Sequence, residues 1–341
     1  MAKAVVSTAG SPGPLSQKKE LPELFRTADS AAIRSQWWHF VFVRVELIAI
    51  SLAALAEVFG QQLASWIIRV FDLQVGSTDI AGRHFTSHEV TTSLASYVIP
   101  AFIMVIAILM FAFRLLFRQN HFWRAQRALA EATKGLAWRY SMRAMNADLH
   151  AGAPLDMSQS HQAFQKELDK LLKQAESLRL PPPKPGEPML PQVMDTLRSS
   201  SLADQIDAYK LERLVNQRDW YARKANRYRN WSIYLQTARF VVYGLGIALI
   251  FFTGFGSNGL GAMTTIAGAV ATWLAGKHYD DLAQSYGSMA RELDGLTNLV
   301  PDASSASHGD PNDLQDIWSI FVDKVETLLN GEHQDWLRNT K

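Results

Sequence analysis

Two short histidine patterns are the residues most suited to binding metal or transferring protons. His84 and His88 stand four residues apart, with Glu89 next, a spacing that would put both imidazoles on one helix face. The surrounding segment lacks a helical pattern and the full His-Glu-x-x-His order, so we interpret it as a solvated loop. Glu332 and His333 are adjacent near the C-terminus, and we interpret them as a surface or packing pair. We therefore expect no metal site.

A glycine pattern offers a second kind of chemistry. Gly254, Gly256 and Gly259 match the dinucleotide fingerprint G-x-G-x-x-G, and Asp280 follows about 20 residues later. That fold needs a strand before the glycines and a second strand that ends in the acid. No segment alternates with the period of a strand, and Asp280 lies in a helical pattern. We interpret the glycines as a turn, and no nucleophile elbow, Walker loop or catalytic carboxylate pair stands out. The sequence predicts neither a cofactor nor an enzyme.

A third pattern interleaves basic and aromatic residues, in RDWYARKANRYRNW at 218–231. Such a stretch can bind nucleic acid, but the net charge of +2 gives no bulk attraction to it. The stretch adjoins a long apolar run, so we interpret it as a helix facing anionic lipid headgroups, with packing against the rest of the chain as the alternative. We expect no nucleic-acid partner. The basic residues of this surface are Arg218, Arg223, Lys224, Arg227 and Arg229.

Long runs without charge are the strongest signal in the chain. Residues 94–113 (LASYVIPAFIMVIAILMFAF) have the ~20 residues that span a bilayer. The run 240–276 is about twice as long, and GFGSNG at 254–259 carries the turn chemistry that would divide it into a helical hairpin. A fourth run, 40–60, holds Arg44, Glu46 and Glu57 near its ends, where such side chains reach the headgroups. Crossings are predicted at about 40–60, 94–114, 240–256 and 260–276. The alternative is a large soluble helical protein with fully buried helices.

Basic residues predict how these crossings are oriented. The segment between the first two crossings holds only Arg69 and Arg83, and the hairpin turn holds no basic residue. The region between the second and third crossings is rich in arginine at both ends. The positive-inside rule therefore puts both termini and this middle region in the cytoplasm.

The last crossing carries two adjacent rows of small residues at helical spacing. Small residues every four positions let helices approach closely in a membrane. These rows indicate either packing within the chain or a subunit interface or pore wall, with threonine hydroxyls exposed to the pore. The candidate pore or helix-packing residues are Gly261, Thr264, Thr265, Ala267, Gly268, Ala271, Thr272, Ala275 and Gly276.

The rest of the chain is helical by pattern, so the predicted fold class is an all-α membrane protein. It consists of two repeated hairpin units of two crossings each, with long cytoplasmic helical extensions. Each half has the order cytoplasmic helix, crossing, turn, crossing, cytoplasmic helix. The predicted divisions are a disordered lead (1–19), a first unit (20–180), a Pro-rich linker (181–200) and a second unit (201–341).

Short motifs around the crossings carry a family resemblance over most of residues 20–341. In the first half they are LFRTADSAAIRSQWW and WRAQRALAEATKGLAWRY, with Asp29 and Lys134 among the matching residues. In the second half they are YKLERLVNQRDWYARKA and IWSIFVDKVETLLNGEHQDW, with Tyr209 and Arg213 among them. The signature residues are Gln36, Arg127, Glu131, Trp138, Gln217, Trp220, Tyr221, Lys224, Trp318, Phe321, Glu326, Glu332, His333 and Trp336. These motifs resemble the SLATT family of bacterial two-transmembrane effector domains, here in two tandem units.

The resemblance implies a membrane effector of a bacterial conflict or antiphage system, built into the inner membrane. Its units are expected to form a homo-oligomeric pore that permeabilises the membrane, in company with a nucleotide-sensing or other conflict-system partner protein. The alternative that stays open is a non-conducting scaffold whose cytoplasmic helical bundle recruits a partner.

Overall fold

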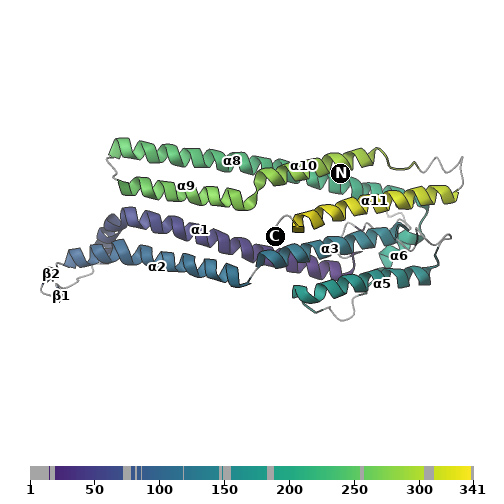
Figure 1. Ribbon diagram of the computed structural model, residues 1–341, viewed down its shortest axis with the longest axis horizontal. Helices are drawn as coiled ribbons and strands as arrows, with labels where there is room; N and C mark the ends of the chain where they lie inside the picture. The colour runs from purple at the N-terminus through teal and green to yellow at the C-terminus, as the bar shows by residue number, and fades with distance from the viewer. Residues whose placement is uncertain are drawn as a thin grey trace, which may run out of the picture. The chain divides into compact units, whose positions relative to one another are not determined.

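The computed structural model describes residues 15, 20–71, 78–80, 83–85, 87–117, 119–145, 148, 155–182, 188–253, 257–302 and 311–338. Its side chains are described over a smaller part, which leaves out 57–97, 249–260, 275–277 and 332–338 among others. Figure 1 shows a structure made almost wholly of helices.

Helices dominate both halves of the chain. The first half contains α1 (Glu23–Phe71), β1 (Thr78–Ile80), β2 (Arg83–Phe85), α2 (Ser87–Phe117), α3 (Gln119–Ser141), α5 (Met157–Ala175) and the short 3-10 helix η2 (Glu176–Leu178). The second half contains α6 (Gln192–Ser199), α7 (Leu202–Ala208), the π-helix η3 (Tyr209–Val215), α8 (Asn216–Thr253), α9 (Ser257–Lys277), α10 (Tyr279–Thr297) and α11 (Pro311–Arg338).

Side chains close the ends of several helices. Asp156 caps α5 because its carboxylate accepts a hydrogen bond from the Gln159 amide at 2.7 Å. The Gln159 side chain in turn accepts one from the Asp156 amide, which completes a capping box. Ser201 caps α7 through the Asp204 amide. His278 has a positive φ of 47° between α9 and α10, and it makes the bend that separates them.

The helices fall into two compact units, and each unit draws on both halves of the chain. Unit 1 comprises residues 1–36, 120–223 and 286–341, and unit 2 comprises residues 37–119 and 224–285. The helices α1, α8 and α10 therefore contribute to both units.

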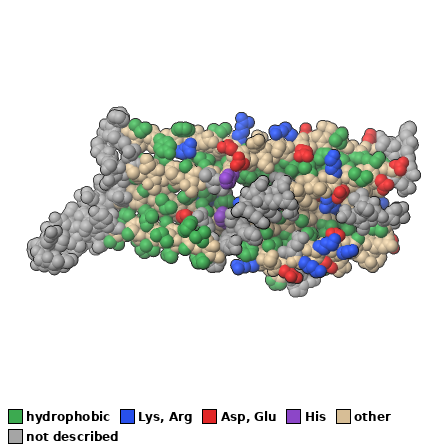
Figure 2. All heavy atoms as spheres, in the orientation of Figure 1, with side chains coloured by type: hydrophobic (Ala, Val, Ile, Leu, Met, Phe, Trp, Pro, Cys, Tyr) green, Lys and Arg blue, Asp and Glu red, His purple; other side chains and the backbone are tan. Residues whose placement is uncertain are grey.

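Unit 1 has a conventional buried core. Its interior holds large rings and aliphatic side chains, including Trp138, Trp318 and Tyr140, together with buried polar groups. Most Lys, Arg, Asp and Glu side chains on the face drawn in Figure 2 lie over its helices.

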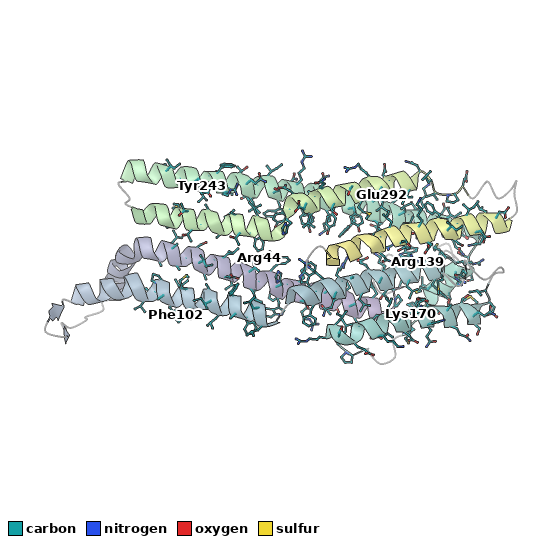
Figure 3. All side chains as sticks on the ribbon, viewed as in Figure 1. Arg44, Phe102, Arg139, Lys170, Tyr243 and Glu292 are labelled. Atoms are coloured by element: carbon teal, nitrogen blue, oxygen red, sulfur yellow. The ribbon has the colours of Figure 1, made fainter. Side chains whose placement is uncertain are left out.

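Unit 2 has the opposite distribution of side chains. Among the described residues, its buried apolar side chains are nearly all alanines: Ala49, Ala53, Ala107, Ala262, Ala267 and Ala269, with Tyr279 beside them. Its large apolar side chains lie on the surface, as Phe102 does with 65% of its area exposed. Phe102 and Tyr243, labelled in Figure 3, come from α2 and α8, and Figure 2 shows hydrophobic side chains gathered over this unit.

Close helix contacts hold unit 2 together. The Trp273 ring of α9 meets the Phe40 ring of α1 edge-on, with ring centres 6.0 Å apart. Phe42 of α1 lies 5.4 Å from the ring of Phe113 of α2. A Cβ at Gly246 of α8 would come 3.0 Å from the Met263 side chain of α9, so that position needs glycine for close packing.

The predicted helical architecture is confirmed in its main lines, with three differences. A short antiparallel hairpin, in which Thr78 pairs with Phe85, interrupts the all-helical order where a loop was expected. The predicted turn at 254–259 is shorter than expected, because α8 ends at Thr253 and α9 already begins at Ser257. Helix α6 lies inside the predicted Pro-rich linker, where Pro191 precedes its first turn and Met194 and Leu197 are buried.

Candidate functional site

The core of unit 1 encloses an ion pair that joins the π-helix η3 to α11. The Glu326 carboxylate is fully buried and accepts hydrogen bonds from Arg213 Nε at 2.8 Å and Nη2 at 2.7 Å. The Tyr209 hydroxyl donates a third bond to it at 2.9 Å. Burial alone would lower the pKa of Arg213, but the Glu326 carboxylate raises it above its ordinary value. The Arg213 guanidinium is therefore held in its charged form.

The π-helix and a glycine bring these groups together. Tyr209 and Arg213 lie four residues apart in η3, and both donate to the same carboxylate oxygen of Glu326. π-Helical turns are rare and occur often at functional sites. Gly135 of α3 lets α11 come close, because a Cβ there would lie 3.1 Å from the Glu326 carboxylate.

Aromatic rings surround the ion pair. Tyr209 stands edge-on to both Trp138 and Trp318, with ring centres 5.5 Å apart in each case. Phe321 stacks on Trp318 at 5.8 Å. Within the described part of the chain, no hydrogen-bond partner is found for the buried indole nitrogens of Trp138 and Trp318 or for Arg213 Nη1. A buried donor without a partner costs free energy of folding, so these three groups reduce the stability of the unit 1 core.

Lys134 of α3 lies beside this cluster. Burial, with added repulsion from Arg213, lowers its pKa from 10.5 to about 8. Glu131 and Glu326 oppose that shift, but they do not cancel it. The Lys134 ammonium is thus the group of the cluster that loses its proton most readily near neutral pH.

A second group of charges continues from Lys134 along α3. Arg127 pairs with Asp29 of α1 at 2.5 Å and with Glu131, four residues on, at 2.6 Å. Asp29 is buried, and Arg127 is about one-third exposed. These contacts tie α1 to α3 within the first half of the chain, and the Arg213–Glu326 pair ties η3 to α11 within the second half. A salt bridge of 3.0 Å between Arg139 of α3 and Asp323 of α11 joins the two halves.

The arrangement is suited to holding helices in register rather than to chemistry on a substrate. Burial and the Glu326 carboxylate raise the pKa of Tyr209 well above its ordinary value, so this phenol stays protonated. The carboxylate of Glu326 has no solvent exposure. We call these residues the unit 1 cluster: Asp29, Arg127, Glu131, Lys134, Trp138, Tyr209, Arg213, Trp318 and Glu326.

A second buried network lies at the C-terminal end of α3, and no sequence pattern predicted it. Arg198 of α6 pairs with Asp148 at 2.6 Å and donates to the Tyr140 carbonyl at 2.7 Å and to Ser160 at 2.8 Å. The Tyr140 hydroxyl donates to Asp195 at 2.5 Å. Apart from Tyr140, which ends the motif WRAQRALAEATKGLAWRY, no motif or periodic pattern marks these residues, because the network joins four separate segments.

The candidate pore residues occupy two sides of α9. Ala267 is fully buried, whereas Gly261, Thr264, Gly268 and Thr272 are exposed. A Cβ at Gly261 or Gly268 would meet no atom within 4 Å.

The threonine hydroxyls of this helix donate to the backbone. Thr264 and Thr265 donate to the Gly261 carbonyl, and Thr272 donates to the Gly268 carbonyl, at 2.8–2.9 Å. Ala271 is partly buried, and the side-chain surroundings of Ala275 and Gly276 lie outside the described residues. We call the exposed row Gly261, Thr264, Gly268 and Thr272 the open face of α9.

The predicted headgroup residues differ in their surroundings. Arg218 pairs with Asp219 at 2.9 Å and with Asp294 of α10 at 3.1 Å. Lys224 lies 5.9 Å from the Tyr228 ring centre. The remaining three, Arg223, Arg227 and Arg229, are exposed.

The other signature residues are spread over unit 1 and its edges. Trp220 and Tyr221 pack against the Tyr286 ring of α10, with centres 5.7 and 5.5 Å apart. Gln36 is exposed and Gln217 is partly buried. Glu332, His333 and Trp336 lie outside the described side chains, as do His84, His88 and Glu89.

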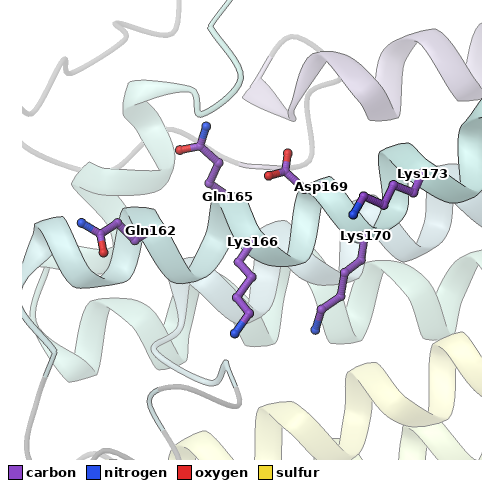
Figure 4. Close-up of a pocket in the computed structure, with 6 residues that line it drawn as sticks. All are labelled: Gln162, Gln165, Lys166, Asp169, Lys170 and Lys173. Carbon is purple, nitrogen blue, oxygen red and sulfur yellow. The ribbon is translucent and has the colours of Figure 1, made fainter.

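The described residues of unit 1 form neither a metal centre nor an enclosed ligand pocket. Among the described residues, no group of three or more His, Asp and Glu could hold a metal ion. A hollow of about 430 Å³ is lined by α5 alone, and Figure 4 shows the side chains that line it. Its side chains are those of Gln162, Gln165, Lys166, Asp169, Lys170 and Lys173. They belong to the outer surface of one helix and form no enclosed site.

Comparison with known families gives two adjacent matches. Residues 80–206 match "SMODS and SLOG-associating 2TM effector domain 3", and residues 209–336 match "SMODS and SLOG-associating 2TM effector domain 1". Together they cover more than half of the chain. No curated protein and no solved structure matches it.

Proposed function

Because the chain belongs to the SLATT family and carries two of its domains in tandem, we propose that it is a multi-pass effector that forms a regulated membrane pore. SLATT domains are two-transmembrane effector domains of conflict systems, and such domains imply a membrane protein. The proposal goes further in five respects: pore formation, homo-oligomers, four crossings, the bacterial inner membrane and cytoplasmic termini.

The reversed polarity of unit 2 is the observation that carries this proposal. A helical bundle in water that exposed Phe102, Ile108 and Leu245 together would be prone to aggregate. In a bilayer the same surface contacts hydrocarbon, and helices associate through small residues at their contacts. Unit 2 has this pattern, with alanines inside and large apolar side chains outside.

Apolar helix length supports at least one crossing. Within the described residues, one segment, 23–56, is long and apolar enough to span a bilayer, and only 11% of its apolar window is buried. A second apolar segment, 98–113, is shorter. The predicted hairpin crossings at 240–256 and 260–276 include side chains that lie outside the described part, at 249–256, 260 and 275–276. Four crossings are therefore part of the proposal.

The open face of α9 is the proposed wall of the pore or contact between subunits. It carries no large side chain, and additional atoms at Gly261 and Gly268 would meet nothing within 4 Å in one copy of the chain. Neighbouring helices could therefore approach it closely. The unit 1 cluster is the proposed gate, because it gathers buried charges from helices of both halves in one core.

A matched pair of glycine substitutions tests the proposal. Gly268→Leu would fill the open face of α9, whereas Gly244→Leu would add the same atoms to an open position on α8. Purified chain in dye-loaded liposomes should release dye when triggered, and only Gly268→Leu should reduce that release.

Three outcomes would count against the pore. Wild-type protein that stays in the liposome membrane and never releases ions or dye under any trigger would refute it. Equal loss in both glycine variants would refute the role of the open face. A silent Gly268→Leu, together with loss of function after alanine replacement of residues 218–231, would favour a non-conducting scaffold that recruits a partner.

A further inference from the structure

Unit 2 contains an apolar groove that the proposed pore does not use. It has a volume of about 300 Å³, at the lower end of the range of ligand pockets. Its walls come from three helices: α1, α8 and α9. The lining residues are Arg44, Leu47, Ile48, Ser51, Leu52, Leu235, Ile266, Ala269, Val270 and Trp273. We call this hollow the Arg44 groove.

One cationic side chain, that of Arg44, lines the groove. The Arg44 guanidinium lies 5.6 Å from the centre of the Trp273 ring. The Phe40 ring, also from α1, contacts the same Trp273 ring edge-on. Arg44, labelled in Figure 3, is exposed, and within the described part of the chain no ion pair joins it to a carboxylate. An arginine with free donors binds phosphate well, because its planar fork matches two phosphate oxygens.

The remaining walls of the groove are apolar. Ser51 is the one other polar side chain among the lining residues, and its hydroxyl donates to the Leu47 carbonyl at 2.9 Å. Ile48 and Leu52 are at least half exposed along α1. A hydrocarbon chain fits such a surface, since it asks for no hydrogen bond.

The charged end of the groove lies where a headgroup would be. Arg44 is near the start of the first predicted crossing, and Trp273 is near the end of the fourth. Both positions belong to the cytoplasmic edge in the predicted orientation, and tryptophan is enriched at such edges. Leu52 and Ile266 lie deeper along the same helices. The groove thus runs from a cation at the interface to apolar side chains in the membrane.

We propose that the Arg44 groove binds one anionic phospholipid of the cytoplasmic leaflet. The lipid phosphate accepts hydrogen bonds from the Arg44 guanidinium, and one acyl chain lies along Leu47, Ile48 and Val270. Basic pockets between membrane helices on the cytoplasmic side are known to hold anionic headgroups. The inference rests on the proposed function in one respect, because unit 2 must lie in a bilayer.

Native mass spectrometry of the full chain in mild detergent tests this site. The purified protein would be titrated with phosphatidylglycerol or with phosphatidylcholine of the same acyl chains. One basic residue near an anionic surface contributes about 1 kcal/mol, so the wild type should prefer phosphatidylglycerol about fivefold. Arg44→Gln should remove that preference.

Two matched controls keep the test specific. Arg239→Gln removes another arginine that lies over an aromatic ring, 5.8 Å from Phe240, but does not line the groove. It should keep the preference for phosphatidylglycerol. Ile48→Trp should block the groove and lower binding of both lipids. Ile247→Trp, at a similarly exposed position on α8 outside the groove, should leave binding unchanged.

Several results would overturn the lipid site. They are equal binding of the two lipids by the wild type, unchanged selectivity in Arg44→Gln, or competition by soluble glycerol 3-phosphate as strong as by the lipid. A dimer that Ile48→Trp dissociates while lipid binding persists would assign the groove to a second copy. If the protein stays in membranes during an alkaline carbonate wash but shows no lipid selectivity, only the lipid site is refuted. If the wash releases the protein from membranes, the proposed function is refuted as well.

Discussion

Unit 1 buries tryptophan rings and an ion pair in its interior, whereas unit 2 buries alanines and carries its large apolar side chains outside. The first arrangement suits water, where apolar burial stabilises the fold. The second suits hydrocarbon, where apolar burial gives no advantage and close helix contact does. One chain therefore contains bundles built for two solvents, and each repeat contributes helices to both.

In each repeat an ion pair joins the helix before the crossings to the helix after them, but the acidic and basic partners are exchanged between the two repeats. In the first half, Asp29 of α1 accepts from Arg127 of α3. In the second half, Arg218 of α8 donates to Asp294 of α10. The first pair is largely buried, and the second is much more exposed. The first should thus matter more to the stability of unit 1, because exposed pairs are screened by solvent.

The largest effect is expected from breaking the buried pair of unit 1. Glu326→Ala would leave Arg213 charged and uncompensated in the core, at a cost of about 3–5 kcal/mol. Thermal unfolding in detergent should show a large loss of unit 1 stability, while the chain still enters the membrane. Asp323→Asn is the control, since its partner Arg139 and the carboxylate itself are partly exposed. It should cost less than about 1 kcal/mol. Equal effects of the two substitutions would contradict the buried role of Glu326.

A pair of isoleucines compares the two surfaces directly. Ile108 of α2 is 60% exposed in unit 2, and Ile320 of α11 is 61% exposed in unit 1. Ile108→Lys should disfavour membrane insertion of α2 by about 2.5–3.5 kcal/mol, whereas Ile320→Lys should be nearly silent. Insertion into microsomes can be scored by glycosylation of an acceptor site beyond α2. If both variants insert and fold like the wild type, the surface of unit 2 does not contact lipid.

A smaller effect should appear in the pH dependence of unit 1. The pKa of Lys134 is about 8 in the folded protein and near 10.5 when unfolded. Between these values the unfolded chain binds the proton and the folded chain does not, so stability rises with pH. The gain from pH 8 to 9.5 should reach about 2 kcal/mol.

A neutral isostere isolates this contribution. Lys134→Met should be more stable than the wild type below pH 8, and the difference should shrink as pH rises. Melting temperatures measured at intervals from pH 7 to 9.5 would show it. Parallel curves for the two proteins would mean that Lys134 is fully charged and solvated throughout.

The sequence predicted the helices and their apolar character better than their packing. The charge-free runs predicted the apolar parts of α2, α8 and α9. A helix that is apolar on all sides can be predicted without knowing which helices pack against it. Ile317 of α11 has the same helical spacing as the buried Phe321 and Val325, yet it is 55% exposed. Periodicity finds a face and does not tell which of its members a neighbouring helix covers.

The unit 1 cluster shows the same limit at the level of single residues. Arg213, Glu326 and Trp318 were all singled out by family motifs, yet no spacing predicts that a π-helix would aim Arg213 at a carboxylate more than a hundred residues later. The Arg198 network was missed entirely. Long-range pairings of this kind depend on tertiary packing, which local sequence does not encode.

The most direct test of the account is to determine on which side of the membrane unit 1 lies and on which side the predicted hairpin turn lies. The chain has no cysteine, so single cysteines can be placed at Gln165 in α5 and at Asn258 in the predicted hairpin turn. In intact cells, a membrane-impermeant maleimide should label Asn258→Cys and leave Gln165→Cys unlabelled, and inverted vesicles should give the reverse. Equal labelling of both sites from one side would contradict a membrane-spanning unit 2, and the proposed pore with it.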